Sequence, residues 1–389
     1  MKVGIIVPYS WSYHGGVINH AEQQAAALRG LGIETRTIAG IDPPGPLSRL
    51  LHLRLGRHEL PGKDVIPIGH TVVIPSNGSL ANVIVSPAAL IRFHRILARE
   101  EFDLLHLHEP AMPIPCVAAL AASSVPVVGT FHASGNLPQL GLARLLYGSL
   151  IERLGARIAV SSVARETAER FFPGRYRIIP NGTPLPPKAN AANRSNQIVF
   201  VGRHDPRKGL QVLIKAWPSI EAGTGARLRV IGADPQSVRK LQNHLGLPLD
   251  GIDLLGQISE TELTRELLAA KILVAPSLGS ESFGMVLTRA FGCATPVVAS
   301  DIPGYRSIAS PETGTLVPGG DAAILASAVI ELLADERRRV ACGWYARELA
   351  ERHYSWEQIA LNLAELYQQL LHPWRYQEAP RRELVTSAA

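Results

Sequence analysis

The sequence predicts an α/β protein built from two doubly wound parallel-sheet domains that face a central cleft. The chain has 389 residues, which is too long for one ordinary hydrophobic core, so two domains are expected. Short apolar strands alternate with helical patterns, which is typical of parallel sheets covered by helices on both faces. The alternation is interrupted once, near the middle of the chain, by a proline-rich stretch at 180–196. This stretch reads as an interdomain linker, because it has little apolar surface to bury.

The first half of the chain predicts the following elements in order. Strands are expected at 3–7, 34–38, 72–75, 104–106, 125–130, 157–160 and 177–179, and helices at 16–31, 87–99, 111–122, 140–154 and 163–171. Residues 43–62 are rich in proline and leucine without clean periodicity, so we expect a mobile insertion there. Asn77-Gly78 is a turn dipeptide after the third strand.

The second half begins again with a strand, a glycine-containing turn and a helix. Strands are expected at 197–201, 227–231, 252–255, 272–275 and 296–299, and helices at 209–220, 235–245, 261–269, 282–292, 321–335, 336–351 and 355–371. We therefore predict one domain at 1–183 and a second at 196–354. The C-terminal segment 355–389 is expected to pack back on the first domain, with frayed residues from 373 onwards.

Composition excludes several classes of protein. The chain is 46% hydrophobic and 19% charged, and it has no apolar run long enough to span a membrane. The N-terminus reads as a first strand and has no usable signal peptide. The cysteines, Cys116, Cys293 and Cys342, lack paired spacing, which favours a reducing cytoplasm. A net charge of +6 favours an anionic partner such as a nucleotide or an anionic lipid surface, whereas the dispersed charge argues against nucleic acid.

The stretch from Pro276 to Asp301 is the centre of the prediction. Its turn presents small residues and the carboxylate of Glu281 where a helix is expected to begin, a place that suits a diphosphate. A carboxylate would repel that anion unless it holds hydroxyls beside it, so we expect Glu281 to face a sugar. The alternative is that Glu281 only caps the helix.

A glycine-containing turn follows the first strand of each half of the chain. Gly15 and Gly16 open the first helix and would let a ligand approach the backbone closely. In the second half, Arg203, Arg207 and Lys208 precede a helix whose dipole is already positive there, so an anion is expected to join them. A solvated basic loop is the alternative.

Histidines follow two buried strands of the first half. The run Leu105–Pro110 contains His106, His108 and Glu109, and His132 ends the strand at 125–130. This spacing can ligate a metal, but the sequence shows no third-ligand cluster, so these side chains are expected to line the cleft. An Asp-x-Asp metal clamp is absent from the sequence. A divalent metal remains possible, although cationic side chains could neutralise the diphosphate instead.

The ordered set of motifs resembles the family 4 retaining glycosyltransferases of the GT-B fold, which has two Rossmann-like domains. The set comprises Gly-Gly near the start, His-Leu-His-Glu-Pro, Thr-Phe-His, Ile-Pro-Asn-Gly, Gly-Arg with Arg-Lys-Gly, Glu-Ser-Phe-Gly and Tyr-Ser-Trp. Within that family the chain looks most like the bacterial phosphatidylinositol mannosyltransferases, over roughly residues 1–370.

The resemblance implies roles for individual residues. His132 and Glu281 would be the catalytic pair, near the reacting carbon and on the sugar hydroxyls. Acceptor-side candidates are the polar residues of the first domain, namely Tyr9, His20, Asn77, Ser79, His108 and Glu109. The donor would lie against Gly15, Gly16, Arg203, Lys208, Ser282, Phe283, Gly284 and Arg289.

Two departures from the family pattern bear on the substrates. Arg289 stands where the family has a second glutamate that holds the ribose, and arginine cannot accept hydrogen bonds from ribose hydroxyls. The turn at Asn77 lacks the basic residues expected for an inositol-phosphate acceptor. The next helix carries Arg92, Arg95 and Arg99 beside apolar residues, which predicts a membrane-surface face or a simply solvated one.

The sequence therefore predicts a cytoplasmic retaining glycosyltransferase, either free in the cytoplasm or peripheral on the inner face of the cell membrane. The expected donor is a nucleotide-diphosphate sugar, with GDP-mannose preferred by resemblance, and the expected acceptor is a lipid or glycan hydroxyl. The alternatives are a UDP-sugar donor, or a degenerate protein that binds nucleotide or sugar without turnover, which Arg289 suggests.

Overall fold

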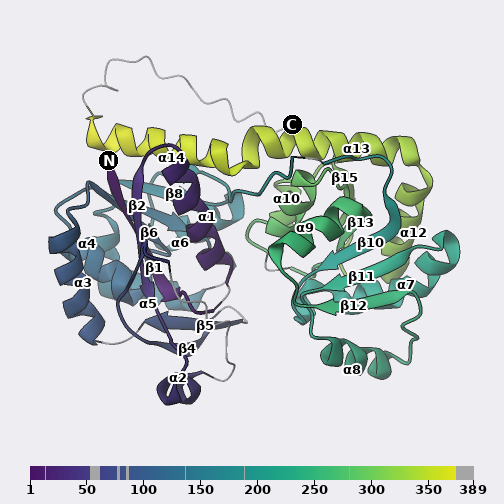
Figure 1. The fold of residues 1–389 in the computed structure, drawn as a ribbon, viewed down its shortest axis with the longest axis horizontal. Helices are drawn as coiled ribbons and strands as arrows, with labels where there is room; N and C mark the ends of the chain where they lie inside the picture. The colour runs from purple at the N-terminus through teal and green to yellow at the C-terminus, as the bar shows by residue number, and fades with distance from the viewer. Residues whose placement is uncertain are drawn as a thin grey trace.

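The fold contains two parallel β-sheets, each covered by helices, in the first and second halves of the chain (Figure 1). This computed structural model describes residues 1–13, 15–52, 62–76, 79–84, 87–135, 137–187, 189–279 and 281–373.

The first sheet has the strand order β3-β2-β1-β6-β7-β8-β9, all in parallel register, with an antiparallel hairpin β4–β5 attached to β1. Its strands are β1 (Lys2–Ser10), β2 (Glu34–Gly40), β3 (Val65–Pro67), β4 (Thr71–Ser76), β5 (Ser79–Ile84), β6 (Leu104–His108), β7 (Val127–Phe131), β8 (Ala156–Ala159) and β9 (Arg177–Ile178). The helices of this half are α1 (Gly16–Gly30), α2 (Pro46–Leu51), α3 (Pro87–Glu100), α4 (Ala118–Ala122), α5 (Pro138–Ile151) and α6 (Ser162–Phe171).

The second sheet has the order β12-β11-β10-β13-β14-β15, again parallel throughout. Its strands are β10 (Ser195–Val201), β11 (Arg227–Ile231), β12 (Ile252–Gly256), β13 (Ala270–Ala275), β14 (Val297–Ser300) and β15 (Gly314–Val317). The helices of this half are α7 (Leu210–Thr224), α8 (Pro235–Leu245), α9 (Glu260–Ala269), α10 (Met285–Gly292), α11 (Pro303–Arg306), α12 (Ala322–Ala334), α13 (Glu336–Leu349) and α14 (Trp356–Leu371).

Both sheets reverse their strand order once, and this reversal positions the site. The switch lies between β1 and β6 in the first sheet and between β10 and β13 in the second. Loops that leave the carboxyl ends of neighbouring strands diverge at such a point, and ligands of doubly wound sheets bind there. The predicted glycine turns and the Glu281 stretch all follow one of these four strands.

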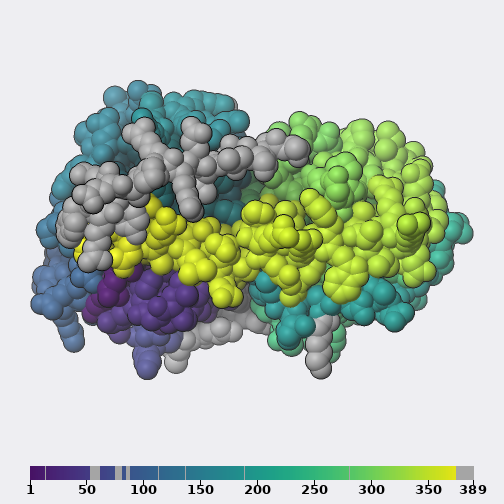
Figure 2. Space-filling view, turned by 90° about the horizontal axis from the view of Figure 1, so that it is seen from above, coloured from purple at the N-terminus to yellow at the C-terminus, as the bar shows by residue number. Residues whose placement is uncertain are grey.

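Two apolar clusters cover the two faces of the first sheet. One packs the sheet against α3, α4, α5 and α6, and the other packs it against α1 and the C-terminal helix α14. Helix α14 reaches the first domain from the second, so α13 and α14 form a band over both domains (Figure 2). The linker runs beside this crossing, where the Thr183 amide donates to the Tyr354 carbonyl at 2.6 Å.

The predicted elements agree with the structure except at a few places. The predicted helix at 111–122 is a π-helical turn, Pro113–Val117, followed by the short α4, because two prolines remove donors from its first turn. The predicted helix at 282–292 begins only at Met285, since Gly284 has a left-handed φ of 91°. The predicted insertion at 43–62 contains α2, which starts with a proline suited to a first helical turn, whereas 53–61 lies outside the described residues.

Strand β15 and helix α11 were not predicted at all. Both are short, at four residues each, and β15 lies at the edge of the second sheet. The predicted domain limits at 183 and 196 stay a prediction, because the sheets show only that the change of domain falls between β9 and β10. Within the described residues, no helix is both long and apolar enough to cross a membrane. The three cysteines are buried free thiols.

Candidate active site

The two loops at the second switch point are joined by an ion pair. Lys208 Nζ lies 2.5 Å from Glu281 Oε1, which also accepts a hydrogen bond from Ser277 at 3.3 Å. The Leu278 amide donates to the Arg207 carbonyl at 2.7 Å, so the backbones of the two loops are joined as well. Glu281, predicted to face a sugar, and Lys208, predicted to face a phosphate, thus form one ion pair.

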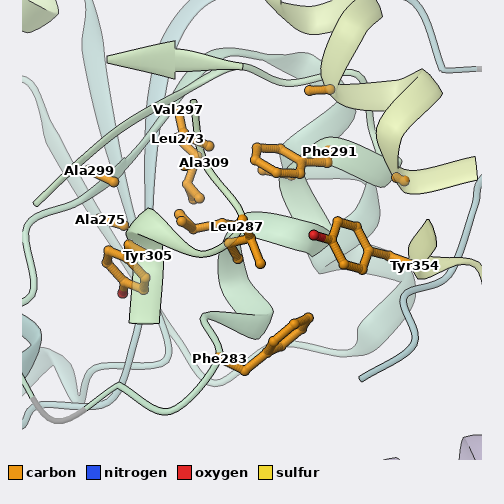
Figure 3. Packing of buried hydrophobic residues seen from close by; sticks show 14 of the residues in the cluster. Leu273, Ala275, Phe283, Leu287, Phe291, Val297, Ala299, Tyr305, Ala309 and Tyr354 are labelled. Atoms are coloured by element: carbon orange, nitrogen blue, oxygen red, sulfur yellow. The ribbon is translucent and has the colours of Figure 1, made fainter. Parts of the chain in front are cut away.

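The segment from Glu281 to Gly284 is anchored in the apolar core. Phe283 is buried and its ring packs edge-on against Tyr354, with ring centroids 5.8 Å apart, at one end of the cluster around Leu287 (Figure 3). A β-carbon on Gly284 would lie 2.8 Å from the Tyr305 ring. This packing places the segment in an extended turn before α10. Glu281 is therefore not the cap of α10, whose N-cap is Gly284, so the alternative reading as a capping carboxylate is wrong.

The basic loop before α7 is partly neutralised within the protein. Arg207 forms an ion pair with Asp205 at 2.6 Å, and the hydrogen bond from Arg207 holds the pKa of the Asp205 carboxyl below its usual value. Arg203 contributes to the same shift through its charge. The predicted cluster of three cations therefore contains one internal carboxylate, which leaves Lys208 as the cation directed at the Glu281 loop.

The first domain meets this loop across the domain boundary. The Ser161 hydroxyl, at the start of α6, donates to the Ser282 carbonyl. Gly16, at the start of α1, lies so close to the start of α10 that a β-carbon on it would be 3.1 Å from Met285 Cε. Gly15 is exposed, and a β-carbon on it would meet nothing within 4 Å. The start of α1 therefore lies next to the Met285 side chain at the start of α10.

Buried imidazoles lie at the switch point of the first sheet. His108 ends β6, His132 follows β7, and His20 comes from α1; His108 Nδ1 and His132 Nε2 are 2.9 Å apart. The His20 ring meets the other two edge-on, with centroid distances of 5.3 and 4.9 Å. Burial lowers the pKa of His20 to about 4 and the pKa values of His108 and His132 well below their usual range. All three rings are therefore neutral at neutral pH, so they can act as hydrogen-bonding groups or lone-pair donors.

A second tier of side chains holds this cluster to α14. His106 stacks on His108 with ring centroids 4.9 Å apart. Its Nδ1 lies 2.5 Å from the Tyr367 hydroxyl and 3.0 Å from the Gln24 amide nitrogen. Trp356, at the start of α14, meets the His20 ring at 5.1 Å. The sequence could place His106 and His108 on one face of β6 by their spacing. It showed Trp356 only as part of the Tyr-Ser-Trp motif, without a role, and nothing in it pointed to Gln24 or Tyr367.

Glu109 supports the backbone that carries His132. Its Oε1 accepts from the His132 amide at 3.1 Å, and its own backbone adopts a left-handed φ of 53°. Burial raises the pKa of the Glu109 carboxyl to about 7, although hydrogen bonds from the amides of His132 and Ala133 oppose that shift. Glu109 therefore orients the turn after β7.

Arg289 contacts a second carboxylate of the second domain, that of Glu260. Its guanidinium forms an ion pair with Glu260, the first residue of α9. Glu260 begins α9, which follows β12, and Arg289 lies in the last turn of α10, which follows β13. The sequence did not predict Glu260, because a glutamate in a first helical turn is common for reasons of helix stability alone.

Of the remaining acceptor-side candidates, Tyr9 lies beside the β4–β5 hairpin. Tyr9 pairs with Val83 of β5, which attaches the β4–β5 hairpin to the end of β1. Asp42, another residue that the sequence did not indicate, accepts from Ser10 at 2.6 Å and from the Thr71 amide at 3.0 Å, and so fixes the base of this hairpin. Asn77 lies outside the described residues, and for Ser79 only the backbone is described.

Comparison with known proteins places the chain in a family. A model of Glycosyltransferase Family 4 matches residues 14–185, and a model of Glycosyl transferases group 1 matches residues 195–335. A phosphatidyl-myo-inositol mannosyltransferase of Mycobacterium leprae is 33% identical over 95% of this chain and 96% of its own length. One from Propionibacterium freudenreichii is 31% identical, covering 94% of both chains.

Solved structures share the fold at lower identity. Sucrose-phosphate synthase from Thermosynechococcus elongatus aligns with a TM-score of 0.70 at 23% identity, over 96% of this chain and 99% of that one. The Anabaena protein HepE, solved with UDP, aligns with a TM-score of 0.70 at 20% identity. The alignment covers 95% of this chain and 100% of HepE. The predicted GT-B fold is thereby confirmed. With the motifs, the two facing switch points and relatives that match over nearly the whole chain, this protein belongs to the family 4 glycosyltransferases and is a hexosyltransferase that uses a nucleotide-sugar donor.

Proposed function

We propose that the enzyme transfers mannose from GDP-mannose, with retention of anomeric configuration, to a hydroxyl of a membrane lipid. The observation that carries this proposal is the Lys208–Glu281 ion pair, which lies just before α10, the helix whose first residue, Met285, meets Gly16 of α1. The names of the relatives that match over nearly the whole chain support mannose as the sugar and a phosphatidylinositol-like lipid as the first acceptor to test.

The diphosphate would bind at the cationic side of this junction. Lys208 and Arg203 would contact its oxygens, and the backbone around Phe283 and Gly284 would add amide donors at the start of α10. Glu281 and Ser282 would hold the sugar hydroxyls. Because Glu281 already accepts the Lys208 ammonium, one carboxylate can orient both the sugar and the cation that binds its leaving group.

Retention would follow from attack on the same face as the departing diphosphate. A double displacement needs two carboxyl groups about 5 Å apart on the two sides of the sugar. Glu281 is the carboxylate at the proposed sugar site, while Glu109 is engaged with the His132 backbone. The leaving phosphate oxygen would therefore take the acceptor proton, and neutral His132 would contact the sugar beside the reacting carbon. Lys208 would stabilise the negative charge that develops on the diphosphate.

The Arg289–Glu260 pair would compensate for the missing family glutamate. The guanidinium cannot accept hydrogen bonds from a ribose, but the carboxylate that it holds can. We therefore assign the ribose contact to Glu260, positioned by Arg289. The arginine would change which residue serves the ribose without abolishing donor binding.

Calorimetry with GDP, UDP and ADP and their sugars tests the donor assignment. Wild-type protein is expected to bind GDP and GDP-mannose at least about tenfold more tightly than the others. Glu260→Gln is expected to weaken binding by about 1–2 kcal/mol, the cost of one hydrogen bond to a charged group. Glu331→Gln, on the exposed face of α12, is the matched control. Preference for UDP would replace the GDP assignment, and unchanged binding by Glu260→Gln would refute the ribose contact.

We also propose that the first domain docks on an anionic membrane surface from the cytoplasmic side. On α3, the side chains of Arg92, Arg95 and Arg99 are exposed together with Ile91, which is 60% exposed. Phe93 of the same helix is buried in the core instead. On α5 of the same sheet face, Leu145 is 82% and Leu146 is 68% exposed. Exposed leucines beside arginines suit the boundary between head groups and acyl chains.

Vesicle co-sedimentation tests this surface. Each arginine near anionic lipid contributes about 1 kcal/mol, so replacing Arg92, Arg95 and Arg99 by glutamine is expected to weaken binding to phosphatidylglycerol vesicles by at least about 30-fold. The control replaces three exposed cations of the second domain, Lys215, Arg239 and Lys240, which changes the net charge equally. Equal losses in the two variants would show that only net charge matters and would refute the docking face.

A further inference from the structure

We propose that His20, His108 and His132 form a binding site for a first-row transition metal ion, with Zn²⁺ as the expected occupant. One ring nitrogen from each residue can be chosen so that all three lie within 4.8 Å of one another, and all three side chains are buried. Three imidazoles with an open fourth position are a known zinc coordination set. The three residues come from three separate parts of the chain, which is why the sequence did not show His20 as a third ligand.

Two ring nitrogens of the cluster, His20 Nδ1 and His108 Nε2, have no hydrogen bond of normal geometry among the described residues. The Gln24 carbonyl oxygen can only accept, so the His20 Nε2 that lies 3.1 Å from it carries the proton. The lone pair of neutral His20 is therefore on Nδ1, which has no hydrogen bond of normal geometry, although the Asn181 amide interacts with this ring. On His108, Nε2 also lacks a partner among the described residues. A buried lone pair without a donor is costly, and a metal ion would satisfy it.

The supporting side chains match those of a built metal site. Ligand histidines usually direct their second ring nitrogen at a fixed acceptor, which sets the tautomer and ring orientation. Gln24 does this for His20, and its own amide nitrogen is held by His106 at 3.0 Å. His106 in turn lies 2.7 Å from the Thr130 hydroxyl. Zinc–nitrogen bonds are about 2.0–2.1 Å long, so three nitrogens bound to one ion lie closer together than 4.8 Å. Binding of the ion would therefore have to move the three rings closer to one another.

The ligand set selects the kind of ion. Neutral imidazoles suit Zn²⁺, Co²⁺, Ni²⁺ and Cu²⁺, whereas Mg²⁺ and Ca²⁺ prefer oxygen ligands. The site is therefore distinct from any divalent ion that accompanies a diphosphate. If His132 contacts the donor sugar as proposed above, a bound metal would withdraw that side chain, and metal and donor would exclude each other.

Cobalt is the spectroscopic probe for the test. Metal-free protein titrated with Co²⁺ is expected to develop the visible bands of tetrahedral cobalt, saturating near one equivalent, and Zn²⁺ is expected to bleach them. His20→Ala should weaken binding by at least about 100-fold, as loss of a ligand exceeds the 10–100-fold effect of an outer partner. His94→Ala is the matched control, because His94 is exposed on α3, where its ring lies 2.8 Å from the Leu90 carbonyl.

Two further measurements keep the outcome decisive. His20→Gln preserves the size of the side chain, so it separates loss of a ligand from failure to fold, which thermal unfolding also monitors. Wild-type protein that shows no saturable band, or His20 variants that bind Co²⁺ as tightly as wild type, would overturn the site. Excess GDP-mannose should displace the cobalt bands. If donor and cobalt both bind without competing, the mutual exclusion is wrong, whereas absence of donor binding contradicts the proposed function and leaves the cobalt result standing.

Discussion

Replacing Glu281 by glutamine is expected to lower kcat/KM for sugar transfer by about 10²–10³-fold, a loss of about 3–4 kcal/mol of transition-state stabilisation. Glutamine keeps the shape of the side chain but removes the charge that holds Lys208 at 2.5 Å. Both the sugar contact and the position of the cation beside the leaving phosphate would then be lost. Initial rates with GDP-mannose and a phosphatidylinositol acceptor measure the effect.

A control variant and a double substitution test whether the loss of activity is specific to the Lys208–Glu281 pair. Glu331→Gln removes an exposed carboxylate from the same domain and should leave kcat/KM within about twofold. Because Lys208 and Glu281 act as a pair, Lys208→Gln should cost little more in the Glu281→Gln background than the first change alone. Fully additive losses would show that the two side chains act independently, and an unchanged rate in Glu281→Gln would refute the catalytic assignment.

Replacing Gly209 by alanine is expected to destabilise the second domain by at least about 3 kcal/mol, or a fall of about 6–12 °C in Tm. Gly209 has a left-handed φ of 69°, and a β-carbon on it would lie 1.8 Å from the Pro276 carbonyl oxygen. The new methyl group must therefore push apart the two loops that carry Lys208 and Glu281. Donor affinity should fall together with the Tm.

Gly225→Ala is the matched control for this prediction. Gly225 also has a left-handed φ, 60°, and ends the same helix α7, but a β-carbon there would meet nothing within 4 Å. It should show only the backbone strain of about 1–2 kcal/mol. Scanning calorimetry and donor titration of both variants separate strain from the clash. Equal effects of the two substitutions would show that the contact with Pro276 does not hold the loops together.

Much of this architecture follows from local patterns in the sequence. Runs of valine, isoleucine and leucine predict the strands, because parallel strands are buried on both faces. The glycine turn at Gly15 and Gly16 predicts where a ligand can approach the backbone closely. Glu281 and Lys208 are predicted from their places after strands. The ordered motifs were sufficient to predict the family and the fold.

Short elements and turn details were less predictable. Strand β15 has four residues at a sheet edge, so its pattern is too brief to recognise. Helix α10 begins after Gly284 because this residue has a left-handed backbone conformation. The Tyr305 ring fills the space that a side chain at position 284 would need, so only glycine fits there. Such effects come from packing, which overrides the local helix preference of Ser282 and Phe283.

The sequence by itself determined the class of the enzyme, the two sheets and the strand ends from which the functional residues come. Only the tertiary structure decided which side chains meet. It paired Glu281 with Lys208 and Arg289 with Glu260. It also brought His20 to His108 and His132. Tyr367 of α14 contacts His106 beside this cluster, although the two residues are 261 positions apart in the sequence. The physical reason is that local spacing fixes the face and end of one element, whereas contacts between elements depend on how whole sheets and helices pack.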